Sequence, residues 1–140
     1  VAGFIGSPQM NFLDAVCKVE GEKVTLQVGQ AGIELPEAKA KKLIEGGYDG
    51  KTVVLGIRPE DVHDEPAFIQ ASPHTVIDAK IRVYEMLGAE VYLYFDYEGA
   101  SMTARVDPRT TARTGDTVSF AFDAEKIHVF DKETEMVITN

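Results

Sequence analysis

The sequence has little of several features that mark common functional classes. It contains one cysteine, so no disulfide can form within the chain. No apolar run approaches the roughly 20 residues that a membrane-spanning helix needs. Basic residues are also few, with 14 Lys and Arg against 23 Asp and Glu, which gives a formal net charge of −9. Nucleic-acid binders normally carry a basic face, so the sequence argues against both a membrane-spanning protein and a nucleic-acid partner.

The single cysteine, Cys17, lies in an alternating run with Ala15 and Val19. This pattern predicts a small buried apolar side chain, and a reactive thiol is the less favoured alternative. The lack of disulfides and of a signal-peptide pattern is typical of a cytoplasmic protein. The chain begins at Val1 rather than at Met, so we expect it to be a fragment of a longer protein.

Motifs for catalysis are missing as well. A phosphate-binding loop needs G-x-x-x-x-G-K-[ST], and the sequence offers only Gly50-Lys51-Thr52, which opens an expected strand. His63, Asp64 and Glu65 are contiguous, so their side chains cannot all converge on one metal ion without a special loop. The sequence therefore predicts no catalytic, cofactor or metal site, and this fragment is not expected to be an enzyme.

Strand patterns dominate what is present. Period-two alternation or short apolar runs bounded by turn residues predict strands at 12–19, 24–28, 52–57, 77–84, 91–95, 101–106, 118–122 and 127–130. Pro36-Glu37 begins one short helix that ends at Gly46-Gly47. The segment 65–73 is rich in proline and polar residues, so we expect a connecting loop there.

An internal repeat organises these elements. Residues 50–63 match residues 115–128 at a constant offset of 65, with five of 14 positions identical. Each unit contains a turn glycine, a strand, and a tight turn that carries Glu and His. Repetition of a supersecondary unit predicts a mostly β fold of two OB-like small barrels or sandwiches with one short helix. We expect the end of a linker helix at 1–10, a first half at 11–73 and a second half at 74–140.

Two groups of side chains are candidates for contact with a partner. Phe4, Ile5, Met10 and Phe12 lie within nine residues, and contiguous apolar surface on a soluble protein marks an interaction site. We expect this group to contact a second copy of the chain, or alternatively to fold back onto its own barrel. A second group comprises Tyr84, Tyr92, Tyr94 and Tyr97, which suit either a barrel wall or a protein interface.

Several segments resemble one family over nearly the whole chain. Residues 1–12, the Leu55–Val62 run with its Arg58-Pro59-Glu60 turn, and residues 83–88 and 127–131 are similar to ATP-binding subunits of maltose and multiple-sugar ABC importers. The resemblance implies a C-terminal regulatory domain of OB-like, TOBE-type fold. It further implies self-association into a dimer, a regulatory protein partner in some relatives, and a cytoplasmic location beside the membrane.

The same resemblance implies an upstream ATPase domain that binds ATP and Mg and contacts the permease subunits. At the Arg58-Pro59-Glu60 turn, we expect Glu60 to accept hydrogen bonds and so to stabilise the local structure.

The alternative function is a small oxyanion-binding β-barrel module of a transport protein, which would draw its donors from Ser72, Thr75, Arg109, Thr110, Thr111 and Arg113. A third reading, single-stranded nucleic-acid binding, predicts a salt-sensitive affinity for oligonucleotides.

Overall fold

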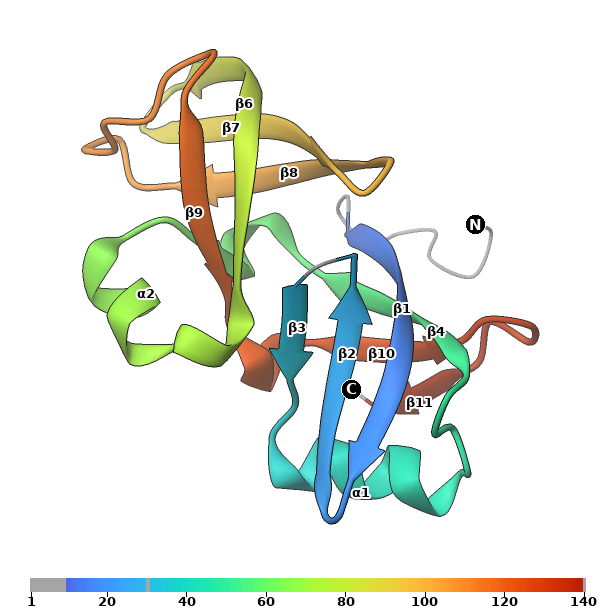
Figure 1. The fold of residues 1–140 in the computed structure, drawn as a ribbon. Helices are drawn as coiled ribbons and strands as arrows, with labels where there is room; N and C mark the ends of the chain where they lie inside the picture. The colour runs from blue at the N-terminus through green and yellow to red at the C-terminus, as the bar shows by residue number, and fades with distance from the viewer. Residues whose placement is uncertain (1–9, 30, 140) are drawn as a thin grey trace.

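The computed structural model describes residues 10–29 and 31–139 and is mostly strand (Figure 1). One sheet has six strands in the order β11-β10-β4-β1-β2-β3, and the other has five in the order β5-β9-β6-β7-β8. The strands of the first sheet are β1 (Asn11–Glu20), β2 (Lys23–Val28), β3 (Ala31–Glu34), β4 (Thr52–Ile57), β10 (His128–Asp131) and β11 (Val137–Thr139). Those of the second are β5 (Val62–His63), β6 (Val76–Leu87), β7 (Glu90–Tyr97), β8 (Ala100–Val106) and β9 (Thr117–Phe122).

All the strand pairs among the described residues are antiparallel, and short turns join the hairpin pairs β1–β2, β6–β7 and β7–β8. Gly21 makes the tight β1–β2 turn with φ of +64°, a conformation that glycine adopts without a steric penalty. In β6 the register with β7 shifts between Ile81 and Val83. This irregularity turns Val83 outward, where it is exposed, while Ile81 stays in the core. The mostly β fold that the sequence predicts is confirmed.

The two copies of the repeat exchange strands between the sheets. β4 lies in the six-stranded sheet and leads through the 3₁₀ turn η2 (Pro59–Asp61) to β5 in the other sheet. β9 lies in the five-stranded sheet and leads through η4 (Ala124–Lys126) to β10 in the first. The two turns meet where the amide of Asp123 donates to the carbonyl of Asp61 at 3.0 Å. The expected division near residue 73 stays a prediction, although sheet pairing crosses it in both directions.

The core fills both sheets and their junction. Phe95 and Phe120 stack at 4.5 Å between ring centroids inside the five-stranded sheet, and Leu26, Leu55 and Val129 are fully buried in the six-stranded sheet. Cys17 is also fully buried. Its burial, with Asp49 nearby as a smaller cause, raises the pKa of the thiol to about 11. The prediction that Cys17 is a small buried apolar residue is therefore confirmed.

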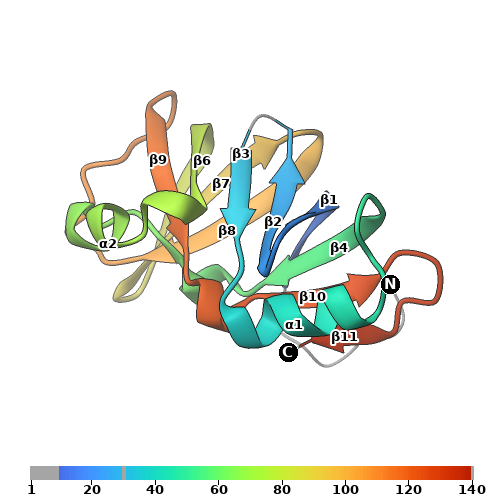
Figure 2. The same ribbon diagram turned by 60° about the horizontal axis from the view of Figure 1, so that its bottom comes forward.

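The helices differ in part from expectation. Helix α1 (Glu37–Glu45) follows Pro36 and ends at Gly46, as predicted, and Figure 2 shows it running beside β10 and β11. A second helix, α2 (Pro66–Ala71), occupies the segment expected to be a loop. Pro66 at its first turn is compatible with a helix, because the missing amide is one that a helix start leaves unpaired. β3, β5 and β11 were also not predicted, since each is too short to show a clear alternation.

Side chains join the two sheets. The side-chain amide of Asn11 on β1 donates to the carbonyl of Thr103 on β8 at 2.8 Å, and its oxygen accepts from the Thr103 amide at 2.8 Å. The hydroxyl of Tyr97 on β7 donates to the carbonyl of Val28 on β2 at 3.2 Å. β1 and β8 therefore lie side by side although they belong to different sheets. The seam between the sheets is fixed by buried polar contacts as well as by apolar packing.

Candidate functional site

The predicted contact residues Met10 and Phe12 lie on the outer face of the six-stranded sheet. Phe12 is paired with Gly56 on β4, and Gly56 is paired with His128 on β10, so the three positions form one row across the sheet. The ring of Phe130 meets Phe12 edge to face at 6.1 Å and stacks against His128 at 6.4 Å. We call the set Met10, Phe12, Gly56, His128 and Phe130 the aromatic face.

Gly56 allows these large side chains to close over the sheet. A Cβ atom at this position would lie 2.7 Å from Sδ of Met10 and 2.9 Å from Cε2 of Phe130. Both distances are shorter than van der Waals contact, so the glycine is required by packing rather than by backbone conformation. Phe4 and Ile5 lie outside the described residues, and the role of the whole group in partner contact stays a prediction.

The four tyrosines divide into two pairs. Tyr97 bonds Val28 across the sheet junction, and Tyr84 packs against the core beneath the guanidinium of Arg113, which lies 4.6 Å from the ring centroid. Tyr92 and Tyr94 point to the outer face of the five-stranded sheet, where the Tyr94 hydroxyl donates to Glu85 at 2.9 Å. One pair therefore belongs to the barrel wall, and the other pair remains a candidate for an interface.

The Arg58-Pro59-Glu60 turn is present as η2, with Pro59 buried at its start. The backbone closes it, since the amide of Asp61 donates to the carbonyl of Arg58 at 2.9 Å and that of Val62 donates to Pro59. Among the described residues, the carboxylate of Glu60 has no hydrogen bond or ion pair, and it faces a groove instead. The hydrogen bonds that we expected Glu60 to accept are therefore not present among the described residues.

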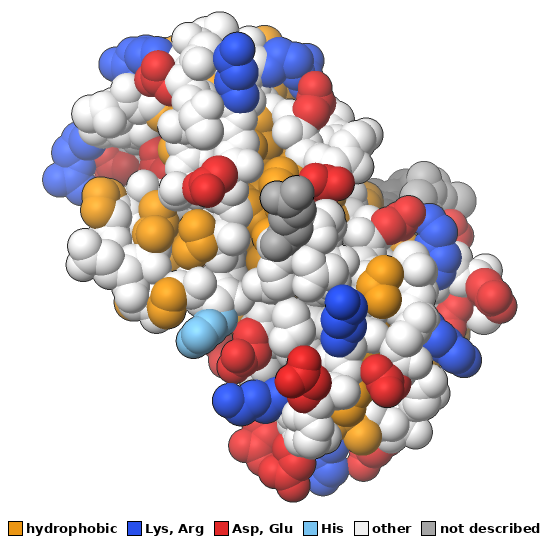
Figure 3. Space-filling view, in the orientation of Figure 1, with side chains coloured by type: hydrophobic (Ala, Val, Ile, Leu, Met, Phe, Trp, Pro, Cys, Tyr) orange, Lys and Arg blue, Asp and Glu red, His pale blue; other side chains and the backbone are white. Residues whose placement is uncertain are grey.

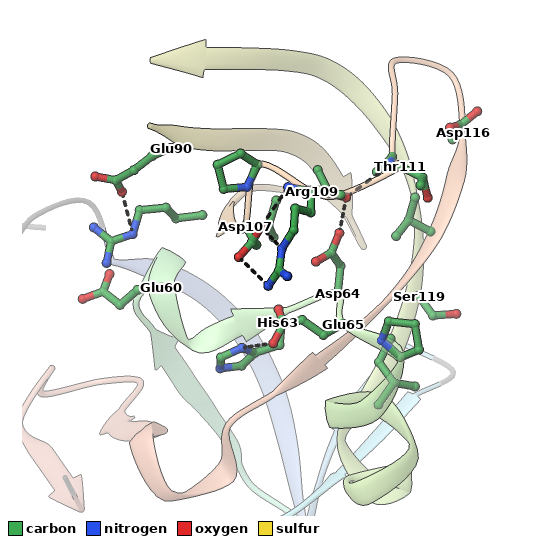
Figure 4. Close-up of a pocket in the computed structure, with 18 of the residues that line it drawn as sticks. Glu60, His63, Asp64, Glu65, Glu90, Asp107, Arg109, Thr111, Asp116 and Ser119 are labelled. Atoms are coloured by element: carbon green, nitrogen blue, oxygen red, sulfur yellow. Dashed lines mark hydrogen bonds and ion pairs between the residues drawn. The ribbon is translucent and has the colours of Figure 1, made fainter. Parts of the chain in front are cut away.

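The groove among the described residues has a volume of about 1190 Å³. Figure 4 shows His63 at the end of β5, with Asp64 and Glu65 after it, on one side of the groove. Asp107, Arg109 and Thr111 from the β8–β9 connection lie on the other side. Glu60 and Glu90 lie toward one end, and Asp116 and Ser119 lie toward the other. Sequence reasoning missed this groove, because its walls are connections whose approach depends on the strand exchange.

Carboxylates outnumber cationic groups in the lining of the groove. Six of them face two guanidinium groups, a net charge of −4 if His63 is neutral. Arg105 pairs with Glu90 at 3.0 Å, and Arg109 pairs with Asp107 at 3.1 Å, so each cation is matched within the groove. The six carboxylates belong to Glu60, Asp64, Glu65, Glu90, Asp107 and Asp116.

Two of these carboxyl groups are shifted in opposite directions. Burial raises the pKa of Asp64, although the Thr110 hydroxyl that donates to it opposes the shift. Hydrogen bonds from the side chain and amide of Arg109 lower the pKa of Asp107. Asp64 also joins the two walls of the groove, because Thr110 belongs to the β8–β9 connection and Asp64 follows β5.

The residues considered for oxyanion binding do not form a donor cluster. Thr75 is buried and donates to the carbonyl of Ser72, while Thr110 donates to Asp64. Arg109 is paired with Asp107, and the guanidinium of Arg113 donates to the carbonyls of Thr110 and Ala112. Arg109, Thr110 and Thr111 line the groove, but its excess of carboxylates repels an anion. The arrangement therefore gives the oxyanion alternative no specific support.

Figure 3 shows acidic and basic side chains interspersed over one face of the molecule, with hydrophobic side chains gathered near α2. The described residues include no group of three or more His, Cys, Asp and Glu side chains that could hold a metal ion. Within the same residues, no helix is long and apolar enough to cross a membrane. The described residues form a small β-barrel domain built from two sheets.

Comparison with known families makes this class specific. A family model described as the MalK OB fold domain matches residues 6–62, and one described as the TOBE domain matches residues 55–130, more than half of the chain. The two matches overlap at 55–62, the segment that contains η2. The chain belongs to the family of OB-fold and TOBE domains found in ATP-binding proteins of sugar ABC importers.

Three relatives illustrate the family. The chain is 43% identical to the oligosaccharides import ATP-binding protein MsmX of Bacillus subtilis and 37% identical to the multiple sugar-binding transport ATP-binding protein MsmK of Streptococcus mutans. It is 36% identical to the trehalose/maltose import ATP-binding protein MalK of Thermococcus litoralis. Each match covers 99% of this chain but only 36–37% of the relative, so the chain spans little more than a third of these proteins.

A solved structure supports the fold independently. The cytoplasmic molybdate-binding protein ModG, in a form with molybdate bound, superposes with a TM-score of 0.62 over 89% of this chain and 96% of its own. The sequence identity is 14%, so this likeness shows a shared fold alone.

Proposed function

We propose that this chain is the non-catalytic regulatory and dimerisation domain, C-terminal in its parent, of the ATP-binding subunit of a carbohydrate ABC importer. The observation that carries the proposal is the match of both domain models and of sugar-importer ATP-binding proteins along nearly the whole chain. ATP and Mg would be bound by an ATPase domain elsewhere in the parent protein. That parent would lie at the cytoplasmic side of the membrane and contact permease subunits through its ATPase domain.

Self-association is assigned to the aromatic face. In a two-fold dimer the same patch of each copy meets its counterpart, so a patch must be complementary to itself. Met10 and Phe12 are half-buried and suit this role, because aromatic and methionine side chains are enriched at interface centres, whereas Phe130 is buried behind them. The ion pair between Lys132 and Asp14, 2.8 Å long, lies on the same face of the sheet as Phe12 and supplies the polar rim expected of an interface.

A pair of matched variants tests which face is used. Phe12→Ser removes an aromatic side chain from the aromatic face, and Tyr92→Ser removes one from the outer face of the five-stranded sheet. Sedimentation equilibrium of the wild type and both variants compares their dimer dissociation constants. We expect at least a tenfold weaker dimer for Phe12→Ser, about 1.4 kcal/mol, and little change for Tyr92→Ser.

A larger effect of Tyr92→Ser than of Phe12→Ser would place the interface on the outer face of the five-stranded sheet, and the proposed function would still hold. Equal, negligible effects of both variants would exclude both faces. Circular dichroism of each variant checks that Phe12→Ser has not unfolded the domain, and Met10→Ala provides a milder change on the same face. Equilibrium dialysis with labelled ATP tests the non-catalytic part of the proposal, and micromolar binding by this chain would contradict it.

A further inference from the structure

The groove between the β5–α2 and β8–β9 connections is not part of the proposed dimer contact, and its residues combine apolar and acidic side chains. Its lining includes the apolar side chains of Pro66, Ile69, Val106 and Val118. Among the described residues, four of the six carboxylates form no ion pair with a Lys or Arg side chain, namely Glu60, Asp64, Glu65 and Asp116. Three of them have other partners, because Asp64 accepts from the Thr110 hydroxyl, Glu65 lies 3.2 Å from Nδ1 of His63, and Asp116 accepts from the Arg113 amide. The groove thus combines apolar side chains with carboxylates that no Lys or Arg side chain of the described residues neutralises.

We propose that this groove is the docking site for an extended segment, rich in Lys and Arg, of a partner protein. The stems of Lys and Arg are hydrocarbon chains that lie well on apolar surface while their charged ends reach outward. The surrounding carboxylates can then accept charge-assisted hydrogen bonds from those ends. The proposal goes beyond dimerisation, and it does not require the aromatic face to be an interface.

The size and charge of the groove select this occupant over others. A volume of about 1190 Å³ exceeds the roughly 300–1,000 Å³ of ordinary small-molecule pockets. An anionic ligand or an acidic peptide would be repelled by the net charge of −4. A single cation would need converging ligands, and the described residues contain no such metal-binding group. The chain's net charge of −9 would also accelerate the approach of a basic partner.

A titration followed by NMR tests the proposal on the chain itself. The probe is a short synthetic peptide that alternates lysine and alanine, and its glutamate–alanine counterpart is the control probe. We expect amide shifts confined to groove residues such as Thr110, Thr111 and Ser119, a binding constant that falls with added salt, and no response to the acidic peptide. Absence of binding at low salt, or shifts spread over the whole surface, would overturn the proposal.

Two double variants with equal charge change separate the groove from general acidity. Glu60→Gln with Asp116→Asn neutralises two groove carboxylates, while Glu22→Gln with Glu133→Gln neutralises two exposed ones elsewhere. We expect at least a tenfold loss of peptide affinity for the groove variant and at most about a twofold loss for the control. Equal losses would contradict a specific site.

A third variant should act in the opposite direction. The Arg109 side chain is 91% exposed and competes for Asp107, so Arg109→Gln should strengthen peptide binding without disturbing the fold. An unchanged or weaker affinity would count against the groove even if the double variant failed to fold. The mass of the chain measured alongside shows dimerisation separately, so loss of peptide binding and loss of the dimer can be told apart.

Discussion

Asn11 and Thr103 form a pair of hydrogen bonds across the junction of the two sheets, each 2.8 Å long. The side-chain amide of Asn11 uses its donor and its acceptor on the backbone of β8, in the way a neighbouring strand would. Asn11 is buried, so neither group has water as a ready alternative. The contact joins the start of β1 to β8, and so it helps to hold the two sheets together.

Loss of this pair should destabilise the fold. Asn11→Ala leaves the amide and carbonyl of Thr103 without their partner, and the cost should be about 1–3 kcal/mol in the free energy of unfolding. Asn11→Asp retains an acceptor but places a charge opposite the Thr103 carbonyl, so it should be no better. Urea denaturation measures both, with Thr25→Ala on β2 as the control. A loss no larger than that of the control would show that the sheets do not depend on this contact.

Asp64 should make stability depend on pH. Its folded-state pKa is raised by burial above the unfolded value of about 3.9. The protonated form is therefore favoured by folding, and this contribution is present below the unfolded pKa and lost as pH rises through the folded pKa. Asp64→Asn keeps an acceptor for Thr110 without the charge. Urea denaturation from acidic to neutral pH should show the free energy of unfolding of the variant rising relative to that of the wild type as pH rises. A difference in the free energy of unfolding that does not change with pH would contradict the raised pKa.

Gly56 should not tolerate a side chain. A Cβ atom there overlaps Met10 and Phe130, so Gly56→Ala should cost about 1–3 kcal/mol through overpacking. Met10→Ala removes one of the two obstructing groups. The double variant should therefore lose less stability than the sum of the single variants, which a double-mutant cycle measures. Strict additivity would mean that Met10 does not close over Gly56 in solution.

Cys17 should be inert in the folded protein. Its thiol is fully buried and its pKa is raised to about 11, so almost no thiolate forms at neutral pH. We expect a thiol reagent such as dithionitrobenzoate to label the chain only after denaturant is added. Rapid labelling of the native chain would show that the β1–β4 region opens readily.

The sequence predicted most of the long strands because their alternation is a local property. The β1–β2 hairpin, β7 and β8 follow from the alternation of apolar residues and from turn glycines, and β4 follows from its short apolar run. The repeat also predicted that residues 50–63 and 115–128 form similar units. It could not show that these units exchange strands, because pairing of β5 with β9 and of β10 with β4 depends on tertiary contacts.

The candidate sites show the same limit. Met10 and Phe12 are apolar neighbours in the sequence, but Phe130 and His128 join them only through the β1–β4–β10 register. The groove carboxylates come from separated segments, from Glu60 to Asp116, and no local pattern links them. α2 was missed because six residues after a proline give too little periodicity to indicate a helix.

The mass of the chain in solution tests the central claim most directly. One copy weighs 15.3 kDa. Light scattering over a concentration series should show the mass rising to twice that value at tens of micromolar, because an isologous dimer forms by mass action. A mass that stays at 15.3 kDa over the whole series would contradict the assignment of dimerisation to this domain.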